Sequence, residues 1–381
     1  MKKLLTKKSN KETVGKKVFI GVSGGVDSSV SLYLLQKAGY DVTGVFIRTW
    51  HPDFISCSWK DDRRDAMRVC ARLGVPFLEF DAEEAYKQKV GEVMIEGYKL
   101  GLTPNPDVLC NEEVKFGVFY DFAKSNGAMV ATGHYADIKN EKLIRGLDKA
   151  KDQSYFLWKI SQDKLKDIIF PIGGIKKTKV RKIAEKIGLH TAKKKDSQGV
   201  CFLGEIDMKD FLSRFVEASS GDVLDTEGNK IGSHDGAIFY TMGERHGFTL
   251  DKPSPNSSPL YVVDKNIEKN TITVSPYPKV KWGSGTIFED LSSYGLEKMD
   301  ERKLVLVKAC NELSGGFSVG EKYDVEFRYH GKIYKAKCLS KKESDKSSIF
   351  MLDVERPLLS SGQSMVVYEK NVCKGGGIIS V

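Results

Sequence analysis

The sequence contains no long run of apolar residues. No stretch reaches the roughly 18 uninterrupted apolar residues that a membrane-spanning helix requires. The first segment, Met1 to Thr13, is rich in lysine and lacks the apolar core of about 7 to 15 residues found in secretory signal peptides. We therefore expect a cytoplasmic protein that does not contact a membrane.

Closely spaced cysteine pairs are also absent. The seven cysteines are an odd number, and none of them forms the C-x-x-C pair of zinc ribbons and dithiol motifs. A disulfide framework is therefore not predicted. Four cysteines fall in helix-like or strand-like patterns, which indicates packing roles: Cys70, Cys310, Cys338 and Cys373.

Length and composition predict a globular chain with several domains. At 381 residues the chain is long enough for two or three domains of ordinary size. Its 40% hydrophobic and 29% charged residues can form buried cores beneath a polar surface, which excludes wholesale disorder.

Positive charge is concentrated in two segments. The first 17 residues carry seven lysines and one glutamate, and Lys176 to Lys195 carries nine lysines or arginines and one glutamate. The rest of the chain is net acidic, because the overall net charge is only +9. The second segment includes a helical pattern over Thr178 to Ile187, so it is either a solvated face or a surface for a polyanion such as RNA.

The first half of the chain alternates strand-like and helical patterns, which predicts a parallel, doubly wound α/β sheet with ligands at the carboxyl ends of its strands. The expected strands are Val18 to Val22, Val42 to Ile47, Phe77 to Phe80 and Ala128 to Thr132. The expected helices are Ser28 to Lys37, Arg63 to Leu73, Glu84 to Leu100, Glu112 to Ser125 and Met208 to Glu217.

The second half contains short strand-like runs separated by Gly, Pro and Asn. Three of them, Gly236 to Tyr240, Tyr261 to Val263 and Thr271 to Val274, predict a small β-rich domain. Five or six further runs after Pro278 have the spacing of a β-barrel. We expect a basic tail over 1–17, a Rossmann-like catalytic domain over 18–217, a central β-rich domain over 218–278 and a C-terminal β-barrel over 279–381.

A glycine-rich loop follows the first predicted strand. Residues Gly21 to Ser29 read Gly-Val-Ser-Gly-Gly-Val-Asp-Ser-Ser and lead into a predicted helix. Glycines allow a tight turn that exposes backbone N–H groups, and the helix N-terminus favours an anion, so this loop suits a phosphate. The loop has neither the lysine of a Walker motif nor the spacing of a dinucleotide-binding motif. It resembles the loop of the PP-loop ATP pyrophosphatases, which implies ATP binding and attack at the α-phosphate.

Two cysteines lie in polar loops. Cys110 ends the segment Thr103-Pro104-Asn105-Pro106-Asp107-Val108-Leu109-Cys110, just before a predicted helix whose dipole would favour a thiolate. Asp107 could act there as a general acid or base. Cys201 follows Lys194-Lys195-Asp196-Ser197-Gln198-Gly199-Val200, where neighbouring lysines would stabilise a thiolate or persulfide. A cysteine of this kind taken alone is more often a small buried residue than a nucleophile.

From Val18 onward the chain resembles the bacterial tRNA-specific 2-thiouridylases, which place sulfur on C2 of the wobble uridine. The resemblance rests on the loops above and on five further motifs, at Thr132-Gly133-His134-Tyr135, Lys151 to Leu157, Phe327-Arg328-Tyr329, Ser361 to Ser364 and Gly375 to Ile379.

The resemblance implies a role for each matching residue. Gly21, Val22, Ser23, Gly24, Gly25, Val26, Asp27 and Ser28 would bind ATP, with Ile47 and Gly133 beside the adenosine. Cys110 would be the nucleophile and Cys201 the persulfide carrier, and the two would form a disulfide as sulfur leaves. The tRNA would contact Asn105, Pro106, Asp107, His134, Lys151, Asp152, Gln153, Arg328, Tyr329 and Gln363.

The chemistry that the resemblance implies requires ATP and Mg²⁺. Adenylation makes the C2 oxygen of uridine a leaving group, persulfide sulfur then displaces AMP, and Mg²⁺ neutralises the departing pyrophosphate. The partners would be tRNA and a cysteine desulfurase or sulfur-relay protein, and we expect a monomer. Ile47, Gln198 and Glu244-Arg245-His246 depart from the residues common in the family, and the last departure puts a basic contact in doubt.

Other interpretations of the sequence remain open. A PP-loop ligase acting on a small molecule would make both cysteines incidental. A tRNA-binding protein with an inactive ATP site would not release AMP. An iron–sulfur cluster could replace the persulfide relay if Cys110, Cys201 and a third cysteine supplied ligands.

Overall fold

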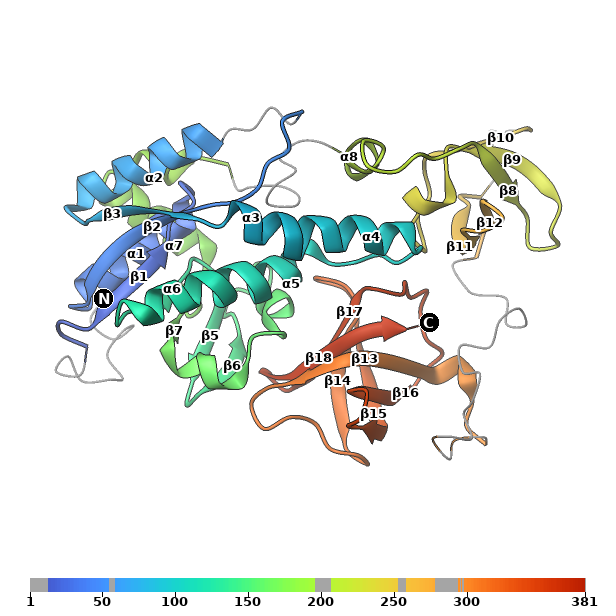
Figure 1. Cartoon of the computed structure of the whole chain (residues 1–381). Coiled ribbons are helices and arrows are strands. Elements are labelled where there is room, and N and C mark those ends of the chain that lie inside the picture. Colours follow the sequence, from blue (N-terminus) through green and yellow to red (C-terminus); the bar gives the residue numbers. More distant parts are fainter. Residues whose placement is uncertain are drawn as a thin grey trace.

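The protein folds around three β-sheets, seen in the computed structural model of Figure 1. The structure describes residues 13–54, 59–195, 207–252, 258–277, 294, 296 and 298–380. Within these ranges no helix is long and apolar enough to cross a membrane. The boundaries proposed above for the four segments stay predictions.

A parallel sheet forms the N-terminal part, as predicted, and it has a fifth strand, β7, that was not predicted. Its strands lie in the order β3-β2-β1-β4-β7, and every pairing is parallel. Because all the strands run the same way, their carboxyl ends and the loops that follow share one edge of the sheet. The strands are β1 (Lys17–Gly21), β2 (Asp41–Arg48), β3 (Phe77–Asp81), β4 (Met129–Ala131) and β7 (Ile168–Ile169).

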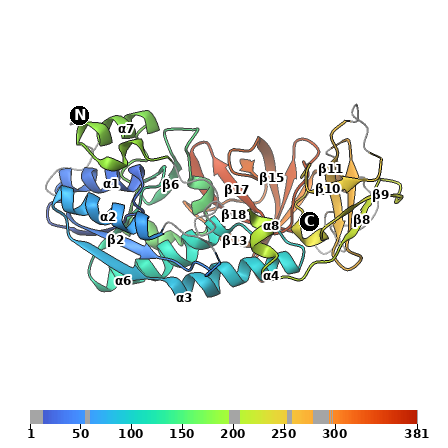
Figure 2. The same cartoon turned by 90° about the horizontal axis from the view of Figure 1, so that it is seen from above.

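Helices pack on this sheet through apolar residues. Val30, Leu32 and Leu35 of α1 are buried, and α7 packs against α1 through Val180 and Ala184. Figure 2 shows α1, α2 and α7 together at one end of the molecule. These helices are α1 (Val26–Lys37), α2 (Trp59–Leu73) and α7 (Lys177–Lys186).

Two longer helical runs contain π-helical segments. The first comprises α3 (Glu83–Tyr86), a π-helical segment (Lys87–Glu92) and α4 (Val93–Lys99). The second comprises α5 (Pro106–Leu109), a π-helical segment (Cys110–Val118) and α6 (Phe119–Ser125). The prediction that the second helix begins near Glu112 is wrong, because Asn105 caps a helix that already starts at Pro106. Cys110 therefore lies inside this helical run.

A β-hairpin from the N-terminal half joins the C-terminal sheet. Strands β5 (Ala136–Lys139) and β6 (Lys142–Arg145) pair with each other, and β6 pairs with β18. The sequence analysis did not predict this hairpin. It links the segment after β4 to the C-terminal sheet.

The central sheet has the order β10-β9-β8-β12-β11. The strand predicted at Gly236 to Tyr240 is wrong. Gly236 has a φ of 140° and donates its N–H to His234 Nδ1, and residues Ala237–Phe239 form a 3₁₀ turn. The elements here are α8 (Met208–Leu212), β8 (Gly221–Leu224), β9 (Lys230–His234), β10 (Phe248–Leu250), β11 (Tyr261–Asn266) and β12 (Thr271–Ser275).

The C-terminal barrel is confirmed as a closed structure of six antiparallel strands. The order β13-β16-β15-β14-β17-β18 closes through pairing of β13 with β18. Its interior contains Val325, Phe350 and Val367, each fully buried. The strands are β13 (Leu304–Glu312), β14 (Lys322–Glu326), β15 (Ile333–Lys342), β16 (Ser347–Leu352), β17 (Ser364–Glu369) and β18 (Val372–Ser380).

Short 3₁₀ helices connect several of these elements. The segments are Ser154–Leu157, Gln162–Asp167, His190–Lys193, Ala237–Phe239 and Glu301–Lys303.

Candidate functional site

The glycine-rich loop forms a compact turn between β1 and α1. Gly24 has a φ of +71°, and a Cβ there would lie 2.4 Å from the carbonyl oxygen of Asp62. Ser28 Oγ accepts a hydrogen bond from the Ser23 backbone N–H at 3.2 Å and donates one to the Gly25 carbonyl at 3.2 Å. A glycine is therefore required at position 24, and the serines hold the loop at the N-terminus of a 12-residue helix, an arrangement that suits a phosphate.

Ile47 and Gly133 adjoin this loop from neighbouring strands. A Cβ on Gly21 would lie 3.4 Å from Ile47 Cδ1, so the ends of β1 and β2 are in contact. A Cβ on Gly133 would lie 2.8 Å from the Ser28 backbone nitrogen, which leaves no space there for a larger residue. The structure thus brings together the residues predicted to bind ATP, and the adenosine contacts stay a prediction.

Asp27 in the loop is paired with a lysine from a distant helix. Lys177 Nζ lies 2.9 Å from Asp27 Oδ1 and 2.7 Å from Oδ2, and the Tyr135 hydroxyl donates to Oδ1 at 2.7 Å. Lys177 is the first residue of α7 and is only 9% exposed. The sequence analysis treated it as one member of a basic segment. No local signal could have identified its partner, because 150 positions separate the two residues.

The basic segment over Lys176 to Lys195 does not present all of its charges to solvent. Lys194 bonds Asp62 and Asp65 of α2, each at 2.7 Å, and Arg181 donates to the carbonyl of Ala192 at 2.7 Å. Six lysines remain exposed and could contact a polyanion: Lys176, Lys179, Lys182, Lys186, Lys193 and Lys195.

Asn105 begins the helical run that contains Cys110. Its side-chain oxygen accepts hydrogen bonds from the N–H groups of Asp107 and Val108, both at 3.2 Å. Pro106 follows at the first helical position, where its fixed φ suits a helix. Cys110 comes one turn later and is 2% exposed. The thiol therefore lies near the helix start but beneath the surface.

Cys110 packs in an apolar cluster that several elements share. The cluster includes Val114, Phe211 and Leu212, and Ile47 packs against it. Ile47 therefore lies close to both the start of the glycine-rich loop and the cysteine cluster.

The cysteines predicted to have packing roles lie in helices and strands, where Cys70, Cys338 and Cys373 are buried and Cys310 is half-buried. Burial raises the pKa of Cys70, Cys310 and Cys338 to about 11 and that of Cys373 to about 12. Such thiols are almost entirely protonated near neutral pH, and they are poor nucleophiles.

Cys201, Gln198 and Cys57 lie outside the described residues. The segment around Cys201 is nevertheless bounded on both sides by well-packed residues. Lys194 is bonded to α2 on one side, while Phe211 and Leu212 of α8 enter the Cys110 cluster on the other.

An aromatic pair connects the neighbour of Cys110 to the barrel. Asn111 Nδ2 donates to the Phe156 carbonyl at 3.0 Å, and the ring of Phe156 lies 4.5 Å from that of Tyr329. Tyr329 also stacks on His330 at 3.9 Å and is 36% exposed. Burial raises the pKa of Tyr329 to about 12, with further contributions from Asp152, Glu326 and Asp107. Asp107 and Tyr329 therefore share one region.

Two other residues predicted to contact tRNA lie on the barrel side. Arg328 is exposed and donates to the Met242 carbonyl at 2.9 Å, so it bridges to the central sheet. Gln363 is half-buried in a turn where the Thr103 N–H donates to the Ser361 carbonyl at 2.8 Å. This bond joins the barrel to the loop that carries Asn105.

The motif Lys151-Asp152-Gln153 is bonded to its own surroundings. Asp152 is 5% exposed and accepts hydrogen bonds from Arg145 at 3.0 Å and from the Gly146 N–H at 2.8 Å. Gln153 Oε1 accepts from the Tyr135 N–H at 3.0 Å, and Lys151 is half-buried. These placements suit a positioning role for Asp152 and Gln153, and their contact with tRNA stays a prediction.

His134 lies at the end of β4 and is 9% exposed. Its Nδ1 lies 2.7 Å from Thr132 Oγ1, and its ring packs on Phe116 and Phe170. Burial holds its pKa well below the ordinary value, and Lys115 adds to this effect. His134 thus forms a hydrogen bond with Thr132 just after the strand, and this bond can account for the histidine without a tRNA contact.

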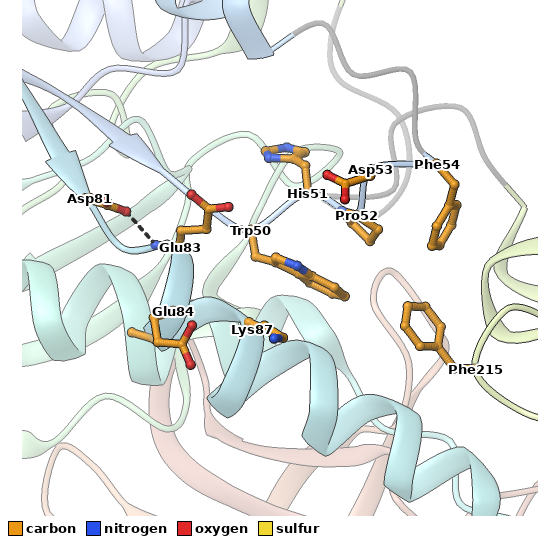
Figure 3. A pocket seen from close by; sticks show the side chains of 11 residues that line it. Trp50, His51, Pro52, Asp53, Phe54, Asp81, Glu83, Glu84, Lys87 and Phe215 are labelled. Atoms are coloured by element: carbon orange, nitrogen blue, oxygen red, sulfur yellow. Dashed lines mark hydrogen bonds between the residues drawn. The ribbon is translucent and has the colours of Figure 1, made fainter.

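A cavity that the sequence did not reveal lies beyond the ends of β2 and β3, with a volume of about 860 Å³. Figure 3 shows Trp50, Phe54 and Phe215 on one side and Asp81, Glu83 and Glu84 on the other. The ring of Phe215 lies 6.2 Å from that of Trp50 and 5.8 Å from that of Phe54. The lining includes neither Cys110 nor any residue of the glycine-rich loop.

No group of three or more His, Cys, Asp or Glu residues suited to a metal ion occurs among the described residues. This search does not include Cys57 or Cys201.

Comparisons with known proteins cover nearly the whole chain. Two family profiles match it: "tRNA methyl transferase HUP domain" over residues 16–205 and "tRNA methyl transferase PRC-barrel domain" over residues 209–276. The tRNA-specific 2-thiouridylase MnmA of Listeria innocua is 39% identical over 370 residues, which cover 95% of this chain and 94% of the relative. The enzyme of the same name from Staphylococcus aureus is 38% identical over 382 residues, with 97% and 96% covered.

A solved structure also matches part of the chain. The U34-tRNA thiolase NcsA of Methanococcus maripaludis, with its [4Fe-4S] cluster, is 20% identical with a TM-score of 0.36, and the match covers 56% of this chain and 69% of that one. This likeness is too remote to bear on function.

Proposed function

This chain belongs to the tRNA-specific 2-thiouridylase family, and on that premise we propose that it activates the wobble uridine of tRNA with ATP and transfers sulfur to it from a cysteine persulfide. As a member of the family it is a sulfurtransferase that acts on tRNA. The observation that carries the proposed mechanism is the position of Ile47. Its Cδ1 would lie 3.4 Å from a Cβ added at Gly21, where the glycine-rich loop begins, and its side chain packs against the Cys110 cluster.

The activation step uses the glycine-rich loop. The N-terminus of α1 would hold the phosphates of ATP while O2 of uridine attacks the α-phosphorus. The bond between the α-phosphorus and its bridging oxygen breaks, and pyrophosphate leaves with the electron pair. The N3 proton of uridine would pass to a base, for which Asp107 is the candidate.

Magnesium would enter with the triphosphate. The phosphates themselves would hold Mg²⁺, which supplies charge neutralisation, because both oxygens of Asp27, the carboxylate of the loop, are already bonded to Lys177.

The sulfur-transfer step uses two cysteines. The terminal sulfur of a Cys201 persulfide attacks C2, and AMP leaves with the former C2 oxygen. The Cys110 thiolate then attacks the Cys201 sulfur, which breaks the S–S bond and leaves sulfur on C2. The two cysteines become a disulfide as the transferred sulfur is reduced, so a thiol reductant must restore them before the next turnover.

Chain connectivity supports a meeting of the two cysteines. Cys201 is six positions before Asp207, the residue that caps α8, and an extended chain of six residues spans about 20 Å. Phe211 and Leu212 of that helix pack in the cluster that contains Cys110. This connectivity supports the proposed meeting of Cys201 with Cys110.

Contacts with tRNA would come from both sides of the loop 103–111. On the barrel side, Arg328 offers a cation and Tyr329 a partly exposed ring for base stacking. On the other side, Asn105, Pro106 and Asp107 would meet the target base, and the exposed lysines of α7 would attract phosphates. Lys151 and Gln363 are half-buried and would contribute at the edges of this surface. His134, Asp152 and Gln153 would support this tRNA-contacting surface from the protein interior.

The test is 2-thiouridine formation in tRNA with a wobble uridine, measured together with AMP in the presence of Mg-ATP, cysteine and a cysteine desulfurase. We expect one AMP for each thiouridine and no AMP without tRNA. Cys110→Ala and Cys201→Ala should make no detectable thiouridine, while Cys310→Ala, a control in the barrel, should match the wild type.

Two results would contradict the proposal. Release of AMP without tRNA would favour a small-molecule ligase. Full thiolation by either cysteine variant would exclude both the persulfide relay and a cluster that these cysteines hold.

A further inference from the structure

The glycine-rich loop contains no cation of its own. Residues Gly21 to Ser29 include one acidic residue, Asp27, and no lysine or arginine. A triphosphate brings about four negative charges, of which one Mg²⁺ would offset two, so backbone N–H groups and a helix dipole leave part of the charge to be balanced. A cation from elsewhere in the chain is therefore expected at this site.

Lys177 is positioned to supply that charge. Its ammonium lies 2.7 Å and 2.9 Å from the two carboxylate oxygens of Asp27, the second residue of α1. It is also the first residue of α7, so the N-termini of two helices meet where the ion pair forms. Asp148 Oδ2 accepts a hydrogen bond from the Lys177 N–H at 2.9 Å and fixes this end of α7.

The surroundings of the ammonium are ordered and largely closed to solvent. The side chain of Lys177 is 11% exposed, and its ammonium lies 5.7 Å from the centre of the Tyr135 ring. The Tyr135 hydroxyl donates to the same carboxylate, which holds Asp27 in place. Neighbouring lysines of the helix, such as Lys179 and Lys182, are exposed instead. A low-dielectric position makes a charge effective on a nearby anion.

We propose that Lys177 is the phosphate-neutralising cation of this site, reaching the loop from α7 in place of a lysine within the loop. Asp27 holds the ammonium beside the loop before ATP binds. As uridine O2 attacks and the bond to the bridging oxygen breaks, Lys177 stabilises the negative charge that develops on pyrophosphate. This inference rests on the proposed function and assigns one further catalytic residue to it.

The test compares leaving groups. The single-turnover rate of AMP transfer to tRNA is measured with ATP, with β,γ-difluoromethylene-ATP, whose leaving group is more acidic than its methylene counterpart, and with β,γ-methylene-ATP. For Lys177→Met we expect the rate with ATP to fall by about 100- to 1000-fold, with the KM for ATP changed far less. The rate loss should be smallest for the difluoromethylene analogue and largest for the methylene analogue.

Two further variants keep the test decisive. Lys139 is an exposed lysine whose Nζ lies 2.7 Å from Asp137 Oδ2. The control variant Lys139→Met should leave all three rates unchanged. Lys177→Arg retains the charge and should recover much of the lost rate, with a weaker dependence on the leaving group than Lys177→Met. Thermal melting establishes that each variant is folded, and Lys177→Arg serves alone if Lys177→Met does not fold.

An equal loss with all three nucleotides would indicate a structural role and overturn the inference, as would an unchanged rate or an effect on KM alone. Absence of tRNA-dependent pyrophosphate release by the wild type would instead contradict the proposed function.

Discussion

The parallel sheet and the C-terminal barrel use their strands differently. In the parallel sheet the inner strands β1 and β4 are largely buried, and the candidate ATP-binding residues follow them at one edge: the loop after β1 and Gly133 after β4. In the barrel the strands close on themselves, and Arg328, Tyr329 and Gln363 lie in connecting segments, of which the Gln363 turn is bonded to loop 103–111. Under the proposed function, activation would take place at the sheet edge and RNA recognition on the barrel side.

A substitution in the glycine-rich loop should have the largest effect. Gly24→Ala would place a Cβ 2.4 Å from the Asp62 carbonyl oxygen at a φ of +71°, so the loop must move. We expect tRNA-dependent pyrophosphate release to fall by about 100-fold or more. Gly127→Ala is the matched control, because it has a φ of +68° but nothing within 4 Å of the added Cβ. Equal activity of the two variants would break the assignment of activation to this loop.

The ion-pair network between the two regions should govern stability rather than chemistry. Arg145 bonds Asp152 at 3.0 Å and Glu326 of the barrel at 2.8 Å, and both acids are buried. Glu326→Gln removes one charge from this network and should lower the free energy of unfolding by about 3 kcal/mol in urea titrations. Exposed Glu343→Gln should leave the unfolding free energy unchanged, and a similar loss there would show that the network has no special role.

On the barrel side, Tyr329→Ala should affect tRNA recognition alone. Loss of one stacking surface weakens binding by about 1.4 kcal/mol, or roughly tenfold in the KM for tRNA, with little change in the KM for ATP. Tyr277→Ala removes a tyrosine that is 73% exposed and serves as the control. An equal loss in ATP turnover at saturating tRNA would contradict the division of activation and RNA recognition between the two regions.

The last prediction concerns pH and His134, which follows β4. Burial depresses the pKa of His134 in the folded protein, so below about pH 6.5 the unfolded chain binds a proton that the folded chain does not. Stability should therefore fall on acidification by up to about 1.4 kcal/mol per pH unit from this residue. His134→Gln should lack this pH dependence. In urea titrations from pH 7 to pH 5, the difference in unfolding free energy between wild type and variant should therefore shrink or change sign. A constant difference would contradict the expectation.

Local signals predicted much of the fold and of the site. The order of strands and helices in the parallel sheet, the glycine-rich loop and the closed barrel all follow from short-range patterns. The helix start at Pro106 could also have been predicted, since asparagine before proline is a helix-capping pattern. The two prolines instead led to the prediction of a loop.

Long-range contacts account for what the sequence did not reveal. The Asp27–Lys177 pair spans 150 positions, and the pairing of β6 with β18 joins opposite halves of the chain. Neither has a local signature, because each depends on how distant elements pack. The strand expected at Gly236 failed for a different reason, since a positive φ and a bond to His234 turn the chain there.

The most direct measurement of the central claim is pyrophosphate release by Cys110→Ala in a single turnover with tRNA and Mg-ATP. If activation and sulfur transfer are separate, this variant should release pyrophosphate at close to the wild-type rate, only when tRNA is present, and make no 2-thiouridine. A variant that fails to release pyrophosphate, or that releases it equally well without tRNA, would contradict the account.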